Sequence, residues 1–376
     1  MNDTPISPRR RAAFRAAAVV LSAAVGLLVL EGALRVLKSD KESETKFSTV
    51  EEALEFSETA SPDPEPGGDT SLKGLLRRSE VEDLVFELKA GLDCVYKGAP
   101  LRTNSLGYRD DEWTEAKPPG TLRVALVGDS VVFGPFVAEE KTYARLVEDA
   151  LTAALFPGGG GRVEALNFGV PGYNSAQEAE VFASRVFRFA PDAVVVGYVG
   201  NDDQMPTFIE DILGQEGDGL LGRSALFQEL ASKSKEEKRR LVRESPEVVM
   251  DERVPEKYRR MVGWPAVERA LRRMGAVASE KKTPVLVTVY ESEAGPKYEP
   301  HPRARRHAQI EALSRELGFD YLDMSAVLGG IARERGWQDI VPLWVSPRNG
   351  HLNEEGHALF AAALSRRLLD SGWLAR

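Results

Sequence analysis

Cysteine is almost absent from this chain of 376 residues, which contains one, Cys94. A single cysteine excludes an intrachain disulfide, so stability must come from a hydrophobic core, and the chain is long enough to bury a large one. No Cys-His motif surrounds Cys94. We therefore interpret it as a small buried hydrophobic residue and not as a nucleophile.

Basic residues are outnumbered by acidic ones. Lys and Arg number 49 against 58 Asp and Glu, which gives a formal net charge of -9. No basic run carries interleaved aromatic residues, and the richest one, residues 233–243, includes Glu236 and Glu237. This pattern predicts a solvated helix face, and nucleic acid is not an expected partner.

Sequence signatures of cofactors and metals are missing as well. The turn after the first predicted strand lacks a Gly-x-Gly-x-x-Gly pattern. His301 and His307 flank three arginines that would repel a cation, and no histidine has zinc-site spacing. His357 is expected to be structural or to cap the last helix. We therefore expect no metal and no cofactor.

The N-terminus has the pattern of a membrane anchor. Four arginines, at positions 9, 10, 11 and 15, precede the uncharged run Ala16–Leu30. Arg15 and Glu31 can direct their charged groups towards the membrane surface, which extends the possible span to residues 12–34. This asymmetry predicts a transmembrane signal anchor within residues 1–37. The cytoplasmic N-terminus would be followed by one crossing of the cytoplasmic membrane and an extracytoplasmic domain. The alternative is a cleaved signal peptide, with small residues at 22–24 as the cleavage site.

Composition divides the rest of the chain. Residues 38–71 are polar and acidic with a proline-rich centre, which predicts a flexible linker. Residues 72–376 are expected to form the main domain, which opens with a mixed segment up to about Gly120. Within it, residues 203–265 interrupt the regular pattern, and we interpret them as an inserted cap or lid.

The main domain alternates strand and helix patterns. The predicted strands are 122–128, 163–168, 193–198, 283–290 and 320–322. The predicted helices are 143–155, 175–189, 264–280, 304–317 and 354–369. Apolar strands that alternate with helices indicate an α/β fold with a parallel sheet covered on both faces. Such folds place their sites at the carboxyl ends of the strands.

Four segments fall where this architecture places a site. They are Gly128-Asp129-Ser130 after the first strand, residues 167–174 after the second, Gly200-Asn201-Asp202 after the third, and residues 349–353 before the last helix. A serine at a strand-to-helix turn exposes its hydroxyl, and acyl transfer needs a base, for which His351 is the candidate. Three groups would serve as oxyanion donors, namely the backbone N–H groups of Ser130 and Gly172 and the side-chain amide of Asn201. Each motif alone is weak, but all four occur in the expected order.

These four segments resemble the sequence blocks of the SGNH/GDSL hydrolase superfamily, from about Asn104 to the C-terminus. Ser130, Gly172, Asn201 and His351 match the residues for which it is named. Residues 104–109 resemble a segment of membrane-anchored bacterial members. The resemblance implies a flavodoxin-like three-layer α/β/α sandwich with a parallel five-stranded sheet. It also implies hydrolysis of esters or thioesters, or removal or transfer of acetyl groups on glycans.

The sequence departs from the family pattern beside the histidine. The family normally has Asp two or three residues before it, where this chain has Asn349 and Arg348. Three explanations stay open. Asn349 orients His351 through its amide oxygen; or a backbone carbonyl or a distant acid such as Asp339 does so; or the chain is a weakened or inactive descendant.

The sequence therefore predicts a serine-dependent ester hydrolase with Ser130, His351 and Asn349 as catalytic residues. Its expected substrate is an acyl ester, either a small molecule or an O-acyl group on an envelope or exported glycan. One alternative is an O-acyltransferase that uses the same residues with a sugar hydroxyl as acceptor. The other, which Asn349 favours, is a catalytically silent glycan-binding or scaffold protein.

Overall fold

The computed structural model describes residues 22, 69–204, 256–291, 304–347 and 349–375. The chain divides into two compact units, one of residues 1–48 with 212–247 and one of residues 49–211 with 248–376. All described residues except Ser22 belong to the second unit. The predicted anchor, most of the linker and residues 205–255 of the predicted cap therefore lie outside the described residues. Among those described, no helix combines the length and apolarity needed to cross a membrane.

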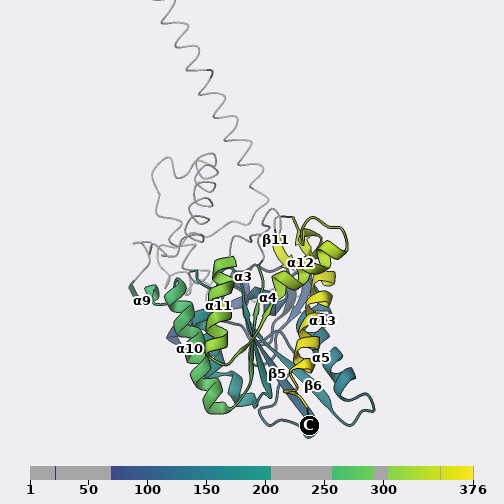
Figure 1. The fold of residues 1–376 in the computed structure, drawn as a ribbon. Helices are drawn as coiled ribbons and strands as arrows, with labels where there is room; N and C mark the ends of the chain where they lie inside the picture. The colour runs from purple at the N-terminus through teal and green to yellow at the C-terminus, as the bar shows by residue number, and fades with distance from the viewer. Residues whose placement is uncertain (1–21, 23–68, 205–255, 292–303, 348, 376) are drawn as a thin grey trace, which may run out of the picture. The chain divides into compact units, whose positions relative to one another are not determined.

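Five parallel strands form the central sheet, and this confirms the predicted α/β fold with a parallel five-stranded sheet (Figure 1). In chain order they are β5 (Thr121–Gly128), β6 (Arg162–Gly169), β7 (Ala193–Tyr198), β8 (Val285–Val289) and β9 (Asp320–Asp323). Their order across the sheet is β6-β5-β7-β8-β9, which is the 2-1-3-4-5 order of flavodoxin-like folds. Loops that follow neighbouring strands therefore meet at one edge of the sheet.

Helices cover both faces of the sheet (Figure 1). One face carries α5 (Tyr143–Leu155), α12 (Met324–Glu334) and α13 (Glu354–Asp370). The other carries α6 (Ser175–Ser184), α10 (Trp264–Lys281) and α11 (Ala304–Glu316). Two helices differ from the sequence prediction. The pattern for 175–189 breaks into α6 and a 3-10 helix, η3 (Val186–Phe189), and α12 is additional.

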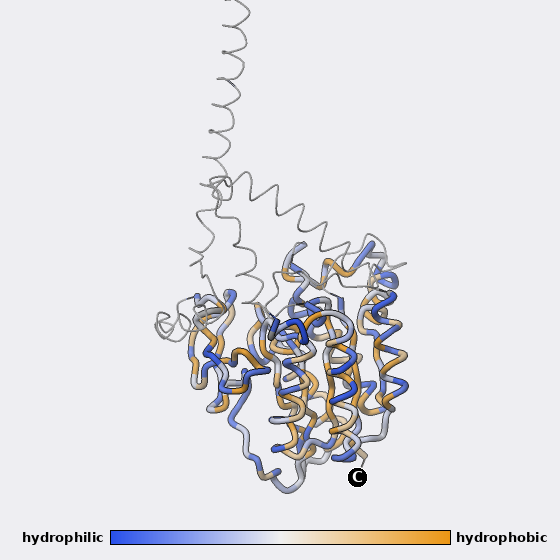
Figure 2. The backbone as a smooth tube through the Cα atoms, turned by 90° about the vertical axis from the view of Figure 1, so that its left-hand side faces the viewer, coloured by the Kyte–Doolittle hydropathy of each residue, from blue (hydrophilic) through white to orange (hydrophobic). Residues whose placement is uncertain are grey.

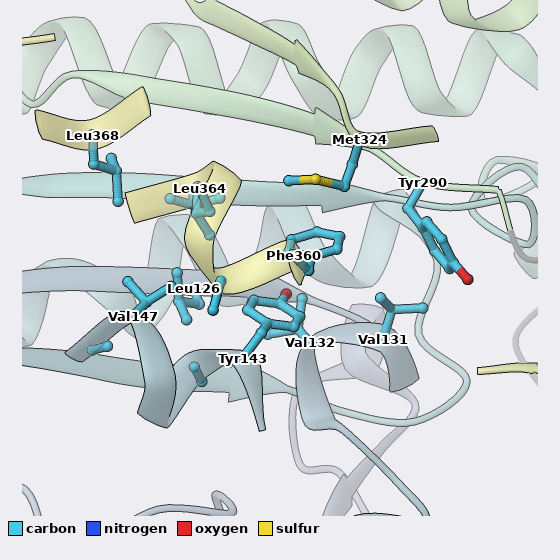
Figure 3. Close-up of a cluster of buried hydrophobic side chains, with 14 of the residues drawn as sticks. Leu126, Val131, Val132, Tyr143, Val147, Tyr290, Met324, Phe360, Leu364 and Leu368 are labelled. Atoms are coloured by element: carbon cyan, nitrogen blue, oxygen red, sulfur yellow. The ribbon is translucent and has the colours of Figure 1, made fainter. Parts of the chain in front are cut away.

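One large cluster of buried hydrophobic side chains lies between β5 and the helices α5 and α13. Alternate residues of β5, such as Val124 and Leu126, point into this layer, where the rings of Tyr143 and Phe360 stack with centroids 4.4 Å apart (Figure 3). Each fully buried aliphatic side chain contributes roughly 1.5–3 kcal/mol by area, as an upper estimate. Along the helices, hydrophilic and hydrophobic residues alternate, as amphipathic helices packed on a sheet require (Figure 2). This packing holds the strand ends rigidly.

The segment before the sheet consists of short elements. They are α3 (Leu72–Leu75), β1 (Leu76–Arg78), η1 (Glu82–Leu84), β2 (Phe86–Leu88), β3 (Asp93–Tyr96) and β4 (Ala99–Arg102). β1 pairs with β2 and β3 with β4, both antiparallel. Asp69 bridges Val95, and the N–H of Thr70 donates to the carbonyl of Val95 at 2.8 Å. The last residues of the expected linker are thus attached to this segment.

The described ends of the predicted insertion lie together. The N–H of Gly263 donates to the carbonyl of Asp203 at 2.7 Å. The amide of Asn174 donates to the carbonyls of Gln204, at 2.8 Å, and Met261, at 2.9 Å. The chain therefore leaves the sheet after β7 and returns through α9 (Glu256–Arg259) to the same place.

Candidate active site

Ser130 begins a four-residue helix, α4 (Ser130–Phe133), directly after β5. Asp129 caps this helix, because its carboxylate accepts a hydrogen bond from the N–H of Val131 at 2.9 Å. The helix ends at Gly134, which has the left-handed backbone conformation. The tight turn leaves Ser130 partly exposed at the carboxyl edge of the sheet, with the side chains of Val131 and Val132 in the core (Figure 3).

Two positions in the segment of residues 167–174 require glycine, each for a different steric reason. A Cβ added at Gly169 would lie 2.4 Å from the backbone nitrogen of Phe133, so only glycine lets α4 approach the end of β6 this closely. Gly172 has φ 83°, a conformation that side chains disfavour. Both residues therefore shape the loop beside Ser130.

His351 reaches Ser130 from a hairpin that the sequence pattern did not predict. Its strands are β10 (Trp344–Ser346), which follows η4 (Val341–Leu343), and β11 (Asn349–Leu352). The hydroxyl of Tyr290, just after β8, donates to the carbonyl of Gly350 at 2.7 Å and ties the hairpin to the sheet. Nε2 of His351 lies 2.8 Å from Oγ of Ser130.

Asn349 lies on the other side of the imidazole. Its Oδ1 is 2.6 Å from Nδ1 of His351 and also accepts the backbone N–H of His351 at 3.2 Å. An oxygen at this position accepts a hydrogen bond from the N–H at Nδ1, which leaves Nε2 unprotonated and able to accept a hydrogen bond from the Ser130 hydroxyl. The carboxylate of Asp339 accepts the N–H of Val341 at 3.0 Å. The geometry is thus that of the first explanation, with Asn349 in the place of the acid.

The surroundings of His351 favour its neutral form. Burial, and secondarily the positive charge of Lys97, lowers the pKa of His351 to about 4. The ring of Phe136 lies against the imidazole, with centroids 5.5 Å apart. A neutral imidazole at pH 7 is the form that accepts a proton from a serine.

Asp129 connects three of the four sequence blocks. Its Oδ2 lies 3.2 Å from Oγ of Ser130, and the carboxylate also faces the side-chain amide of Asn201. The amide of Asn201 donates to the carbonyl of Tyr173 at 3.2 Å, which joins the third block to the second. Burial raises the pKa of Asp129, and the donors around it oppose that rise. Sequence reasoning missed this linking role; a carboxylate capping the helix of the nucleophile was the available signal.

Two more acids lie behind this centre. Glu178 of α6 and Asp202 are both buried, and the N–H of Val199 donates to Asp202. Burial comes first among the causes that raise the pKa of each well above its usual range, and repulsion from neighbouring carboxylates, including Asp129, adds to it. These two acids therefore lose their protons at higher pH than exposed carboxyls do. No local sequence pattern indicates this pairing, because α6 and the loop after β7 meet only in the fold.

The remaining histidines and the cysteine serve structural roles or lie elsewhere. Nδ1 of His357 accepts the N–H of Tyr143 at 3.1 Å, which matches the structural role expected for it. His307 lies 3.4 Å from Asp323, whereas His301 is outside the described residues. Cys94 is buried in β3. In the described part of the chain, no three His, Cys, Asp or Glu side chains are grouped to hold a metal ion.

Comparisons with known proteins identify the family. The model of the GDSL-like Lipase/Acylhydrolase family matches residues 126–359, which is more than half of the chain. The fold is similar to a lipase/acylhydrolase from Enterococcus faecalis, with 14% identity, 66% of this chain and 96% of that chain covered, and a TM-score of 0.42. It is also similar to Axe2, an acetylxylan esterase from Geobacillus stearothermophilus, with 16% identity, coverages of 66% and 94%, and a TM-score of 0.41.

No curated protein matches the chain. The family match runs from the end of β5 through the turn with Ser130, the loops that carry Gly172 and Asn201, and the hairpin that carries His351. The chain therefore belongs to the GDSL-like lipase/acylhydrolase family.

Proposed function

We propose that this chain is a serine-dependent ester hydrolase in which Ser130 is the nucleophile and His351 its general base. The observation that carries the proposal is the 2.8 Å contact between Oγ of Ser130 and Nε2 of His351, two residues that lie 221 positions apart. Contact between a nucleophile and a base oriented by a third group is the arrangement that acyl transfer requires. Asn349 is the third group here.

The proposed reaction has two steps. Oγ of Ser130 attacks the ester carbonyl while Nε2 of His351 takes its proton, and the imidazolium then returns this proton to the leaving alcohol. The resulting acyl-serine is hydrolysed by water, which His351 activates in the same way. The oxyanion needs hydrogen-bond donors, and we assign this role to the backbone N–H groups of Ser130 and Gly172 and to the side-chain amide of Asn201.

The test uses the full-length chain and a fluorophosphonate, which forms a bond with an activated serine. We expect mass spectrometry to place the label on Ser130, and we expect hydrolysis of p-nitrophenyl butyrate to fall to background in Ser130→Ala. A folded wild-type chain that neither takes the label nor hydrolyses esters would be a binding protein on a hydrolase fold. Full activity in a folded Ser130→Ala would refute the role of the serine.

We also propose that the domain lies outside the cytoplasmic membrane, anchored by residues 1–37, and acts on acyl esters of an envelope or exported glycan. The four arginines before Ala16–Leu30 support this topology. A periplasmic reporter fused after Arg376 should be active, and the protein should stay in membranes after a carbonate wash. A soluble form beginning near residue 25 would show a cleaved signal peptide instead.

A further inference from the structure

The hairpin of β3 and β4 is fastened to the helix that begins with Ser130. The ring of Tyr96 packs edge-on against Phe133 of α4, with centroids 6.1 Å apart. The buried guanidinium of Arg109 donates to the carbonyl of Pro100 in β4 at 3.1 Å and to that of Val137 at 2.7 Å. It also donates to the carbonyls of Phe133 and Gly134 at the end of α4. The turn of the hairpin is therefore held in place relative to the nucleophile.

That turn consists of Lys97 and Gly98, since Tyr96 pairs with Ala99. Both turn residues have positive φ, 52° at Lys97 and 76° at Gly98, as a two-residue type I′ turn requires. Asn, Asp or Gly is the usual residue at the first position, because a Cβ disfavours this conformation. A lysine here accepts backbone strain to place a long cationic side chain at the tip.

Among the described residues, no acidic side chain neutralises the ammonium group of Lys97. Lys97 is exposed, its Nζ lies 5.7 Å from the centroid of the Tyr96 ring, and no carboxylate of the described residues pairs with it. Its charge nevertheless reaches His351 and opposes protonation of the imidazole. A cation beside the base hinders the reaction, because the base must become an imidazolium in the transition state.

An anionic group on the substrate would remove this disadvantage. It would pair with Lys97, screen the lysine from the imidazolium, and hold the ester beside Ser130. We propose that Lys97 is a specificity residue and that the preferred substrates are esters with a carboxylate or similar anion close to the scissile bond. This inference rests on the proposed esterase function.

Two matched pairs of esters test the inference with the full-length chain. Mono-(4-nitrophenyl) succinate and 4-nitrophenyl butyrate differ by a carboxylate in the acyl part. The second pair, 4-acetoxybenzoate and 4-acetoxybenzamide, differs by a charge in the alcohol part. We expect the wild type to prefer the anionic member of at least one pair by about fivefold in kcat/KM at low ionic strength, as for a favourable exposed ion pair. The preference should decline in high salt.

Lys97→Met should abolish this preference and Lys97→Glu should reverse it, whereas Lys97→Arg should retain most of it. Arg102→Met is the matched control, because it removes one positive charge from the far end of the same hairpin. It should leave the preference unchanged. Equal anion preference in Lys97→Met and wild type would overturn the inference, as would the absence of any preference in an active wild type.

A binding measurement separates this inference from the proposed function. In the Ser130→Ala background, calorimetry with 4-acetoxybenzoate should show weaker binding when Lys97 is also replaced by Met, and 4-acetoxybenzamide should show no such difference. This comparison needs no turnover. Loss of ester hydrolysis in the wild type with intact Lys97-dependent binding would refute the proposed function alone, and Lys97-independent binding would refute the inference.

Discussion

Oδ1 of Asn349 lies 2.6 Å from Nδ1 of His351, in the position where related hydrolases have a carboxylate. The amide oxygen accepts the imidazole N–H and selects the tautomer that a general base needs. It is neutral, however, and could not offset the charge of the imidazolium that would form if Ser130 lost its proton as proposed. Asn349 can therefore orient the imidazole of His351, but it supplies no negative charge to stabilise an imidazolium.

Replacing Asn349 with Asp should supply that support. We expect Asn349→Asp to raise kcat/KM by at least about tenfold, since loss of the acid from a serine-protease triad costs about 10⁴-fold. The new charge should also raise the pKa of His351, so the rise of activity with pH should move to higher pH. The measurement is a pH–rate profile with a neutral ester.

Asn349→Ala is the control for this prediction and should lower the rate, because it removes the orienting oxygen. Identical profiles for wild type, Asp and Ala variants would show that position 349 does not act on the base. Asn349 precedes Gly350, a pair prone to deamidation, so mass spectrometry must confirm that the wild type has not already gained the acid.

The low pKa of His351, about 4, predicts an unusual pH dependence for the wild type. The base is active when neutral, so activity should rise between about pH 3 and 5 and then stay level through neutrality. An ordinary histidine would give a rise near 6.5. Lys97, His357 and Phe136 surround the imidazole. In Lys97→Met the rise should move to higher pH, and a wild-type midpoint near 6.5 would contradict the prediction.

Replacement of Asn201 tests whether its side-chain amide is an oxyanion donor. Its amide donates to the carbonyl of Tyr173 at 3.2 Å, which holds it at the edge of the site. Asn201→Ala should lower kcat by about 10²–10³-fold, or about 2.7–4 kcal/mol, with little change in KM. A thermal melt should show that the variant is folded. A loss confined to KM would indicate a role in binding and not in transition-state stabilisation.

The buried acids Glu178 and Asp202 should limit stability at high pH. Their pKa values are raised, so the folded state binds protons more tightly than the unfolded state, and stability declines as pH rises above the unfolded values. Glu178→Gln removes one ionisation and should raise the melting temperature at pH 8; a gain of about 1 kcal/mol corresponds to about 2–4 °C.

The advantage of Glu178→Gln should shrink as the pH falls towards 4, where the wild-type acids are protonated without cost. Glu180→Gln on the same helix removes a partly exposed charge that is paired with Arg273, and it should show no such trend. A constant difference at all pH values would attribute the effect to packing and not to ionisation.

Local pattern was sufficient for the main features of the sheet. Apolar runs such as Ala193–Tyr198 have a length and composition that predict buried strands, and their alternation with helices predicts the parallel order. The hairpin of β10 and β11 was missed, because its strands are short and their residues only partly buried. Short elements of this kind depend on contacts, such as that of Tyr290 with Gly350, that no local pattern shows.

The sequence by itself determined the fold class and the candidates Ser130, Gly172, Asn201 and His351, because strand periodicity and turn residues are local properties. Only the tertiary structure decided which group faces Nδ1 of His351. It alone brought Lys97 near the base and placed Asp129, Glu178 and Asp202 together. These contacts join residues up to 221 positions apart in the chain. They depend on how the sheet, helices and loops of the whole domain pack together, which no single segment determines.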